Sequence, residues 1–307
     1  MNRVAIRREP VEGGELKVAW FRQPPEAEDR ERLLESALDG IGIETAGRLE
    51  RGSLDWLDDF PCRYLHLGSK VLPPIPTATQ RRLEHLSLFG RLSRRDVLRT
   101  ENLPALRTLS ADDEHLAGDL SRLEKLEGLH LGKVRDPDFA RLSGCTGLSR
   151  VRFECSLTGP NRVVRLDPGA ELPLLSEIVI ERGRIESLEG VERLPALRYL
   201  VVVPTSIPED VPRIDVRPLA GCRRLDHLAI GLSGRLEGVR HLESLPDLRQ
   251  LTEVEEWSQG VHDDALVRLW NAAPRLVPAD APISGVPVDG SRTDRSRAWL
   301  LVASPRP

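Results

Sequence analysis

The seven-residue string LPALRTL, residues 103–109, returns almost unchanged as LPALRYL at residues 194–200 and as LPDLRQL at residues 245–251. Looser copies read LPLLSEI, LEKLEGL, CTGLSRV and CRRLDHL, and an apolar residue follows two positions after each unit. The shared pattern is therefore L-x-x-L-x-x-L-x-L. A unit this short cannot bury its own apolar face, so its repetition predicts a stack of equivalent segments that bury one another.

The period of the repeat is short. If the second apolar residue of each unit is taken as its origin, successive origins lie 21, 23, 20, 22, 27, 22, 28 and 23 residues apart. The nine origins are Cys62, Leu83, Leu106, Leu126, Leu148, Leu175, Leu197, Leu225 and Leu248. Helical repeats, the alternative, need about 34–47 residues per unit, and apolar segments such as IVI and LVVV favour strands.

The L-x-L part of each unit alternates in hydrophobicity, which predicts a short strand with one buried face. The segments LEHLSL, LEGLHL and LSEIVI carry the L-x-x-L-x-L signature, so residues 60–255 resemble leucine-rich repeat proteins with short, internalin-like or phosphatase-regulator-like units. The resemblance implies an α/β repeat fold. We expect a curved solenoid with a parallel β-sheet on its concave face and a cap at each end.

One position departs from that family. Asparagine usually lies three residues after the last strand leucine and ties neighbouring turns together. The chain has no asparagine there, but Arg91, Glu114, Val134, Ser156, Gly183, Thr205, Ser233 and Glu256. We expect backbone or hydroxyl contacts to replace the asparagine ladder.

The chain outside the repeats reads as two caps. Residues 1–60 are expected to form an N-terminal cap, with a strand at 15–21, a helix at 25–40 and a degenerate first rung near 43–49. About nine repeats then fill residues 61–256.

The C-terminal cap is assigned to residues 257–307. It contains a predicted helix at 262–276, a loop rich in Pro, Gly and Ser at 278–296, and a strand at 298–304. Insertions in a repeat protein map to loops that can bind ligands, and two units carry them, at residues 156–171 and 204–218.

The four cysteines predict no disulfide framework in a chain of 307 residues. Cys145 and Cys222 replace a repeat leucine three rungs apart, about 15 Å, whereas a disulfide needs Cα atoms within about 7 Å. Cys62 also takes a core position. Cys155 follows its strand and is expected to be accessible, and none is expected to be catalytic.

Composition argues against several partner classes. The net charge of -4 with 30% charged residues gives no drive toward nucleic acid or an anionic membrane. No stretch approaches the ~20 apolar residues of a membrane span, and no signal peptide is recognisable. We therefore expect a cytoplasmic protein. Arginine accounts for 40 of the 44 basic residues, which indicates a bacterial, GC-rich genome.

No catalytic or cofactor motif stands out. The HDD string at residues 262–264 reads as a helix cap with an acidic first turn, and GGEL near residue 13 lacks the Lys-Ser/Thr of a phosphate loop. Four histidines, at 66, 85, 130 and 227, fall on strand positions that should face outward, but no further zinc ligand converges on them. Ubiquitin ligases that follow leucine-rich repeats use a cysteine beyond them, and here the last is Cys222. We expect no enzyme activity, cofactor or metal.

A protein partner on the concave face is the favoured function, by resemblance to leucine-rich repeat proteins. The exposed strand positions are polar and basic in the first repeats and more apolar later, with Arg152 and Tyr199 as expected anchors. The predicted contact residues are Tyr64, His66, His85, His130, Arg150, Arg152, Val179, Tyr199, Val201, His227 and Ala229.

Other readings remain open. An insertion or the C-terminal tail could cover the apolar patch within the same chain. The protein could be an immunity or inhibitor protein that blocks a toxin or enzyme encoded nearby, or an accessory subunit of a modifying enzyme. A hydrolase with an unrecognised site is the least favoured.

Overall fold

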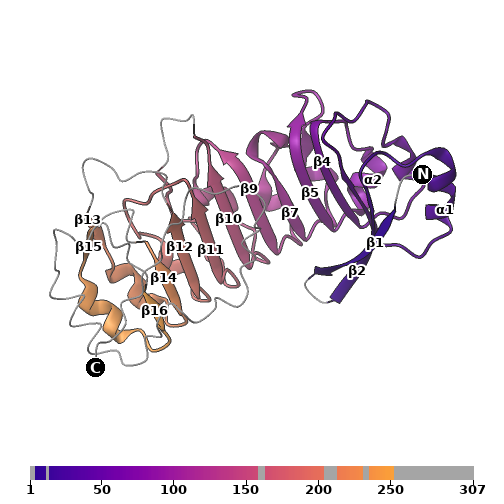
Figure 1. Ribbon diagram of the computed structural model, residues 1–307. Helices are drawn as coiled ribbons and strands as arrows, with labels where there is room; N and C mark the ends of the chain where they lie inside the picture. Colours follow the sequence, from indigo (N-terminus) through magenta and orange to yellow (C-terminus); the bar gives the residue numbers. More distant parts are fainter. Residues whose placement is uncertain (1–3, 12–13, 158–162, 204–212, 231–234, 252–307) are drawn as a thin grey trace. The chain divides into compact units, whose positions relative to one another are not determined.

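The computed structural model describes residues 4–11, 14–157, 163–203, 213–230 and 235–251 (Figure 1). The chain divides into two compact units. The first comprises Met1–Arg135 and Arg141–Ser156, and the second comprises Asp136–Ala140 and Leu157–Pro307.

The first unit holds a sheet whose strands follow the chain order. All neighbours pair in parallel except the first two, which form an antiparallel hairpin. The strands are β1 (Ala5–Val11), β2 (Gly14–Phe21), β3 (Gly40–Glu44), β4 (Tyr64–Leu72), β5 (His85–Leu92), β7 (Thr108–Asp112), β9 (Gly128–Val134) and β10 (Arg150–Cys155). A second, two-stranded sheet pairs β6 (Leu98–Arg99) with β8 (Leu116–Ala117).

Short helices and 3-10 turns connect these strands. They are α1 (Ala27–Leu34), η1 (Asp55–Asp58), α2 (Thr77–Arg82), η2 (Thr100–Asn102), η3 (Asp113–His115) and η4 (Leu120–Arg122). A further turn, η5 (Phe139–Leu142), follows β9 in the chain.

The second unit continues the same plan. Its parallel strands are β11 (Glu177–Glu181), β12 (Tyr199–Val203), β14 (His227–Ala229) and β16 (Gln250–Leu251). Beside them, β13 (Arg213–Asp215) pairs in parallel with β15 (Arg235–Glu237). The connecting 3-10 turns are η6 (Val191–Arg193), η7 (Arg217–Gly221) and η9 (Val239–Ser244).

The L-x-x-L portion of each unit is a tight turn that leads into a strand. In seven units the backbone amide of the second apolar residue donates to the carbonyl three residues earlier, as in Leu106 to Leu103 at 3.1 Å and Leu197 to Leu194 at 3.0 Å. The turn points both side chains inward, and the next residues leave it as an extended strand.

The nine repeat origins form the core. Eight of them are completely shielded from solvent, and the ninth, Leu248, is 3% exposed. The strand residues of the L-x-L segments are buried beside them, for example Leu129 with Leu131 and Ile178 with Ile180. The predicted parallel ladder and its leucine column are confirmed.

The ladder begins earlier than the first clear repeat. Strand β3 lies within the segment assigned to the N-terminal cap and pairs in parallel with β2 on one side and β4 on the other. Helix α1 is shorter than the expected helix at 25–40. It ends before Asp39, because that residue exchanges hydrogen bonds with Lys17 and leads into β3.

Several expectations fall partly or wholly outside the described residues. The predicted helix at 262–276, loop at 278–296 and strand at 298–304 all lie there. The insertion at 156–171 is described at residues 156–157 and from residue 163, where Val164 and Leu166 are buried and Val163 bridges to Arg184. The insertion at 204–218 is described from residue 213, where β13 begins.

Removing one leucine from the column should destabilise the second unit. We expect Leu197→Ala to lower the free energy of unfolding by about 2–5 kcal/mol, because the side chain is fully buried and leaves a cavity. Urea denaturation followed by circular dichroism measures the change. Leu174→Ala is the matched control, since Leu174 is 55% exposed, and should change stability by less than about 0.5 kcal/mol. Equal losses in the two variants would contradict the repeat register.

Candidate functional site

The sheet face opposite the leucine column carries two rows of side chains in each unit, and we call it the outer strand face. In the first unit the rows run Tyr64, His85, Thr108, Gly128, Arg150 and His66, Ser87, Ser110, His130, Arg152. In the second unit they run Glu177, Tyr199, His227, Gln250 and Val179, Val201, Ala229. The register thus aligns the predicted contact residues of each unit on this face.

The histidines of the first unit are held by their neighbours along these rows. His85 Nδ1 lies 2.8 Å from Thr108 Oγ1, and His130 Nδ1 lies 3.0 Å from Ser110 Oγ. The hydroxyl on the adjacent rung fixes each ring. Both contacts join side chains within the chain, so these rings are positioned before any partner arrives.

The N-terminal hairpin covers the first rungs of the outer strand face. The ring of Trp20, from β2, lies over Gly42, where an added Cβ would be 2.5 Å from the indole. The same ring contacts His66 with centroids 4.8 Å apart, and Trp20 Nε1 donates to Glu9 Oε1 at 2.8 Å. Because Gly42 has no side chain, the Trp20 ring extends from β2 across β3 and contacts His66 on β4.

This cover changes the titration of the residues beneath it. Burial, with a smaller effect from the Glu9 carboxylate, raises the pKa of Tyr64 to about 12. Burial also lowers the pKa of His66, although the nearby Glu44 acts in the opposite direction. Tyr64 and His66 thus belong to the packing of the hairpin as well as to the outer strand face.

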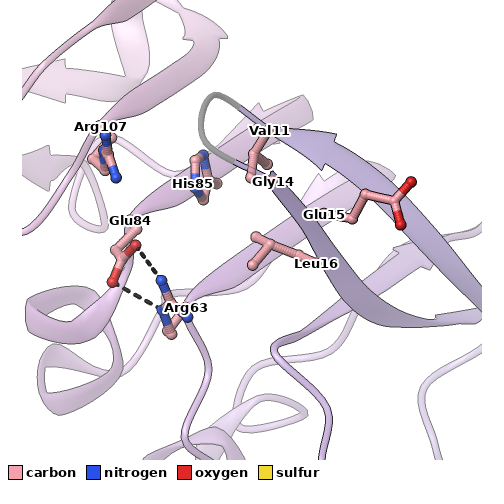
Figure 2. A pocket seen from close by; sticks show the side chains of 8 residues that line it. All are labelled: Val11, Gly14, Glu15, Leu16, Arg63, Glu84, His85 and Arg107. Atoms are coloured by element: carbon pink, nitrogen blue, oxygen red, sulfur yellow. Dashed lines mark hydrogen bonds and ion pairs between the residues drawn. The ribbon is translucent and has the colours of Figure 1, made fainter.

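A cleft of about 320 Å³ lies where the hairpin meets β4, β5 and β7 (Figure 2). Val11, Gly14, Glu15 and Leu16 of the hairpin form one wall, and Arg63, Glu84, His85 and Arg107 form the other. The Arg63 guanidinium donates two hydrogen bonds to the Glu84 carboxylate, at 2.9 and 2.8 Å. This ion pair lowers the pKa of Glu84 and raises that of Arg63.

The polar wall of the cleft belongs to a longer arrangement that the sequence analysis missed. The residue immediately before β3, β4, β5, β7 and β9 alternates in charge, in the order Asp39, Arg63, Glu84, Arg107 and Glu127. Arg63 Nη1 is 3.5 Å from Asp39 Oδ1, and Arg107 Nε is 2.9 Å from Glu127 Oε1. In the second unit Arg198 and Arg249 flank Asp226 at 3.7 and 4.0 Å. The signal was visible in the sequence at a constant offset from each L-x-L segment.

Three predicted contact residues are not available at the surface. His85, His227 and Ala229 are 5%, 6% and 9% exposed, so the expectation that they are exposed is wrong. His85 packs between Tyr64 and Thr108, and His227 packs against the ring of Tyr199 at a centroid distance of 6.2 Å. Side chains on adjacent rungs cover much of each imidazole ring, so little of its surface reaches solvent.

The second unit retains an apolar strip on its outer strand face, formed by Val179, Tyr199 and Val201, which are all half-buried. Val203, two residues further along β12, is 41% exposed. The guanidinium of Arg198 lies 5.7 Å from the centroid of the Tyr199 ring and extends the strip with a cation. Among the predicted residues of the first unit, Arg150 is exposed, and His130 and Arg152 are half-buried.

All four cysteines are buried and free of disulfides. The burial expected for Cys62, Cys145 and Cys222 is confirmed, but the accessibility expected for Cys155 is wrong, since it is 1% exposed. Cys155 ends β10 and pairs with Val134, so its side chain follows the inward alternation of the strand. Burial raises the pKa of Cys62 to about 12, of Cys145 to about 11 and of Cys222 to about 12.

Within the described part of the chain, one group of side chains has ligand atoms close enough to hold a metal ion. It comprises Asp112, Glu114 and His115, at and just after the end of β7. None of the four histidines singled out by the sequence takes part. No helix in the described residues is long and apolar enough to cross a membrane.

Comparisons with known proteins find backbone likeness alone. No family model matches the chain, and no curated protein matches its sequence significantly. Among solved structures, an internalin C2 of Listeria monocytogenes is 19% identical, covers 58% of this chain and 74% of its own, and has a TM-score of 0.42. An internalin F of the same organism is 16% identical, covers 76% and 79%, and has a TM-score of 0.41. A plant peptide hormone receptor, solved with its hormone, is 13% identical, covers 70% and 39%, and has a TM-score of 0.46.

Removing the Trp20 ring should expose His66. We expect Trp20→Ala to raise the pKa of His66 toward its ordinary value of about 6.5, because burial is the main cause of its lowered pKa. An NMR titration of the imidazole protons measures the shift. Trp56→Ala is the control, since Trp56 packs against Phe60. An unchanged His66 titration in Trp20→Ala would show that the hairpin does not cover this ring.

The buried thiols should resist modification. We expect a thiol reagent to label none of the four cysteines in the native protein on the timescale in which it labels all four in urea, because each is buried and three have raised pKa values. Mass spectrometry of the labelled protein identifies the sites. Rapid native labelling of Cys155 would restore the original expectation of an accessible thiol.

Proposed function

Because the chain is a leucine-rich repeat protein, we propose that it is a non-enzymatic binding module that holds another protein on the outer strand face of its second unit. The observation that carries this proposal is the apolar strip of Val179, Tyr199 and Val201, which lies in register across β11 and β12 and is only half-buried. Exposed apolar surface edged by tyrosine and arginine is typical of an interface core.

The strip is better suited to an anchor role than the face of the first unit. There the first rungs already contact the chain's own hairpin through Trp20 and His66. In the second unit Tyr199 presents an aromatic ring beside the Arg198 guanidinium. Tyrosine and arginine are enriched among residues that dominate binding energy. On the first unit, His130, Arg150 and Arg152 are proposed separately as polar contacts.

The chemistry of the buried thiols argues against a cysteine nucleophile. A nucleophilic cysteine needs a lowered pKa and access to substrate, whereas the thiols of Cys62, Cys145 and Cys222 have raised pKa values and lie in the core. We further propose a cytoplasmic location, because four buried free thiols suit a reducing compartment.

The double substitution Tyr199→Asp, Val201→Asp tests the proposal. Placing two carboxylates in the strip should reduce recovery of a protein partner in affinity capture by at least about tenfold, because truncating a central anchor typically weakens binding by 2 kcal/mol or more. Wild type and variant are captured side by side from native lysate and compared by quantitative mass spectrometry. Circular dichroism establishes that the variant is folded.

Leu174→Asp is the matched control for this experiment. Leu174 is 55% exposed in the same unit but lies in the turn before β11, outside the outer strand face. Its substitution should leave recovery unchanged. A partner that both carboxylate variants retain equally would move the binding surface elsewhere. The identity of a partner lost only from the double variant would show whether the protein inhibits a neighbouring enzyme or assists one.

A further inference from the structure

A cluster of two carboxylates and one imidazole lies at the end of β7, apart from the residues used above. Asp112 is the last residue of the strand, and Glu114 and His115 belong to the 3-10 turn η3. One ligand atom from each of the three lies within 4.8 Å of the others. The neighbouring Asp113 is directed elsewhere, since it pairs with Arg141 at 2.7 Å.

The imidazole of His115 is the unusual member of the cluster. It is completely buried, and neither ring nitrogen has a hydrogen-bond partner of acceptable length and angle, although the backbone of Gly90 lies close enough to interact with the ring. Its Nε2 lies 3.9 Å from Asp112 Oδ2, which is too long for a hydrogen bond. Buried polar atoms are almost always satisfied in folded proteins. The His115 Nε2 and the Asp112 carboxylate therefore face each other with room for an atom that would bind both.

The gap is close to the width that a metal ion needs. Zinc binds imidazole nitrogen at about 2.0–2.1 Å and carboxylate oxygen at about 2.0–2.2 Å, so at tetrahedral angles two such ligands lie about 3.3–3.5 Å apart. The separation of 3.9 Å between Nε2 and Oδ2 is about 0.5 Å wider, so the two side chains must draw together slightly to share an ion. Glu114 is exposed, so it can swing toward an ion without disturbing the core.

A cation already occupies one side of the cluster. The Lys133 ammonium pairs with Asp112 Oδ2, and the Lys133 side chain is 57% exposed. Lys133 has φ +52°, a conformation that residues with a Cβ rarely adopt, and the register between β9 and β10 shifts beside it. The bend in β9 therefore directs an exposed positive charge at the carboxylate that a metal ion would use.

We propose that Asp112, Glu114 and His115 bind a divalent transition-metal ion of the zinc class, and that the ion displaces Lys133 from Asp112. One nitrogen and two carboxylate ligands suit Zn²⁺ or Co²⁺, whereas Ca²⁺ and Mg²⁺ take oxygen ligands. Three protein ligands leave a position for water or for a group from a bound protein. The released lysine would become a free surface cation.

Titration of the full-length, chelator-treated protein with Co²⁺ tests this site. We expect saturable binding of one ion, with visible absorption bands of nitrogen and oxygen ligation that Zn²⁺ abolishes by competition. Glu114→Gln should raise the Kd for Co²⁺ by at least about tenfold, as loss of a metal-site residue commonly does. Glu114 is exposed, so this variant keeps the fold, and Glu124→Gln is its matched control with no change.

Lys133→Ala gives a second test, because its effect on Co²⁺ affinity is expected only if Asp112 binds the ion. Removing the competing ammonium should tighten Co²⁺ binding several-fold, while the exposed-lysine control Lys125→Ala should leave the Kd unchanged. The proposal is overturned if Co²⁺ binding does not saturate, or if Glu114→Gln binds as tightly as wild type. It is also overturned if the spectrum shows sulfur-to-cobalt charge transfer, which would place the ion on a cysteine.

Discussion

Strands β4, β5, β7, β9, β10, β12 and β14 are each tied to the preceding rung by a single carbonyl that accepts two amides. The Glu84 carbonyl receives the amides of Arg107 and Thr108 at 2.7 and 3.0 Å, and the Arg107 carbonyl receives those of Glu127 and Gly128 at 2.7 and 3.0 Å. The same pairing recurs where Ser176 receives Arg198 and Tyr199. Because this contact sets the register at the start of these strands, the leucines inside and the polar rows outside follow from it.

The same junction explains where the charges lie. The residue that accepts the two amides sits at a bend, so its side chain projects beside the equivalent side chain of the next rung. Like charges there would repel at every step, whereas alternation lets Arg63 serve both Asp39 and Glu84. Such partly exposed pairs contribute little individually, but together they avoid a row of like charges.

The buried half of the fold was predictable from the sequence because one residue type, repeated at a fixed offset, fills it. All nine predicted origins are buried, and the inward cysteines at 62, 145 and 222 followed from replacing leucine. Strand β1 was not predictable, because AIRREPV is nearly all exposed and pairs by a hairpin outside the repeat. The burial of His85 depends on the neighbouring Tyr64 and Thr108 side chains, and that of Cys155 on β10 continuing its inward alternation to its last residue. The metal-binding cluster joins a strand end to a turn, and no motif marks that combination.

The antiparallel hairpin also determines at which end of the sheet further repeats can be added. The backbone amide and carbonyl of Lys17 point toward Asp39. The backbone groups of the alternate residues of β2, such as Leu16 and Val18, therefore point toward β1. It follows that Ile6, Arg8 and Pro10 present the outer edge of β1. Pro10 has no amide to offer there, and charged or proline residues at a sheet edge discourage further pairing. Gene duplication could therefore lengthen this array by inserting rungs after β3, but not by adding rungs ahead of the hairpin.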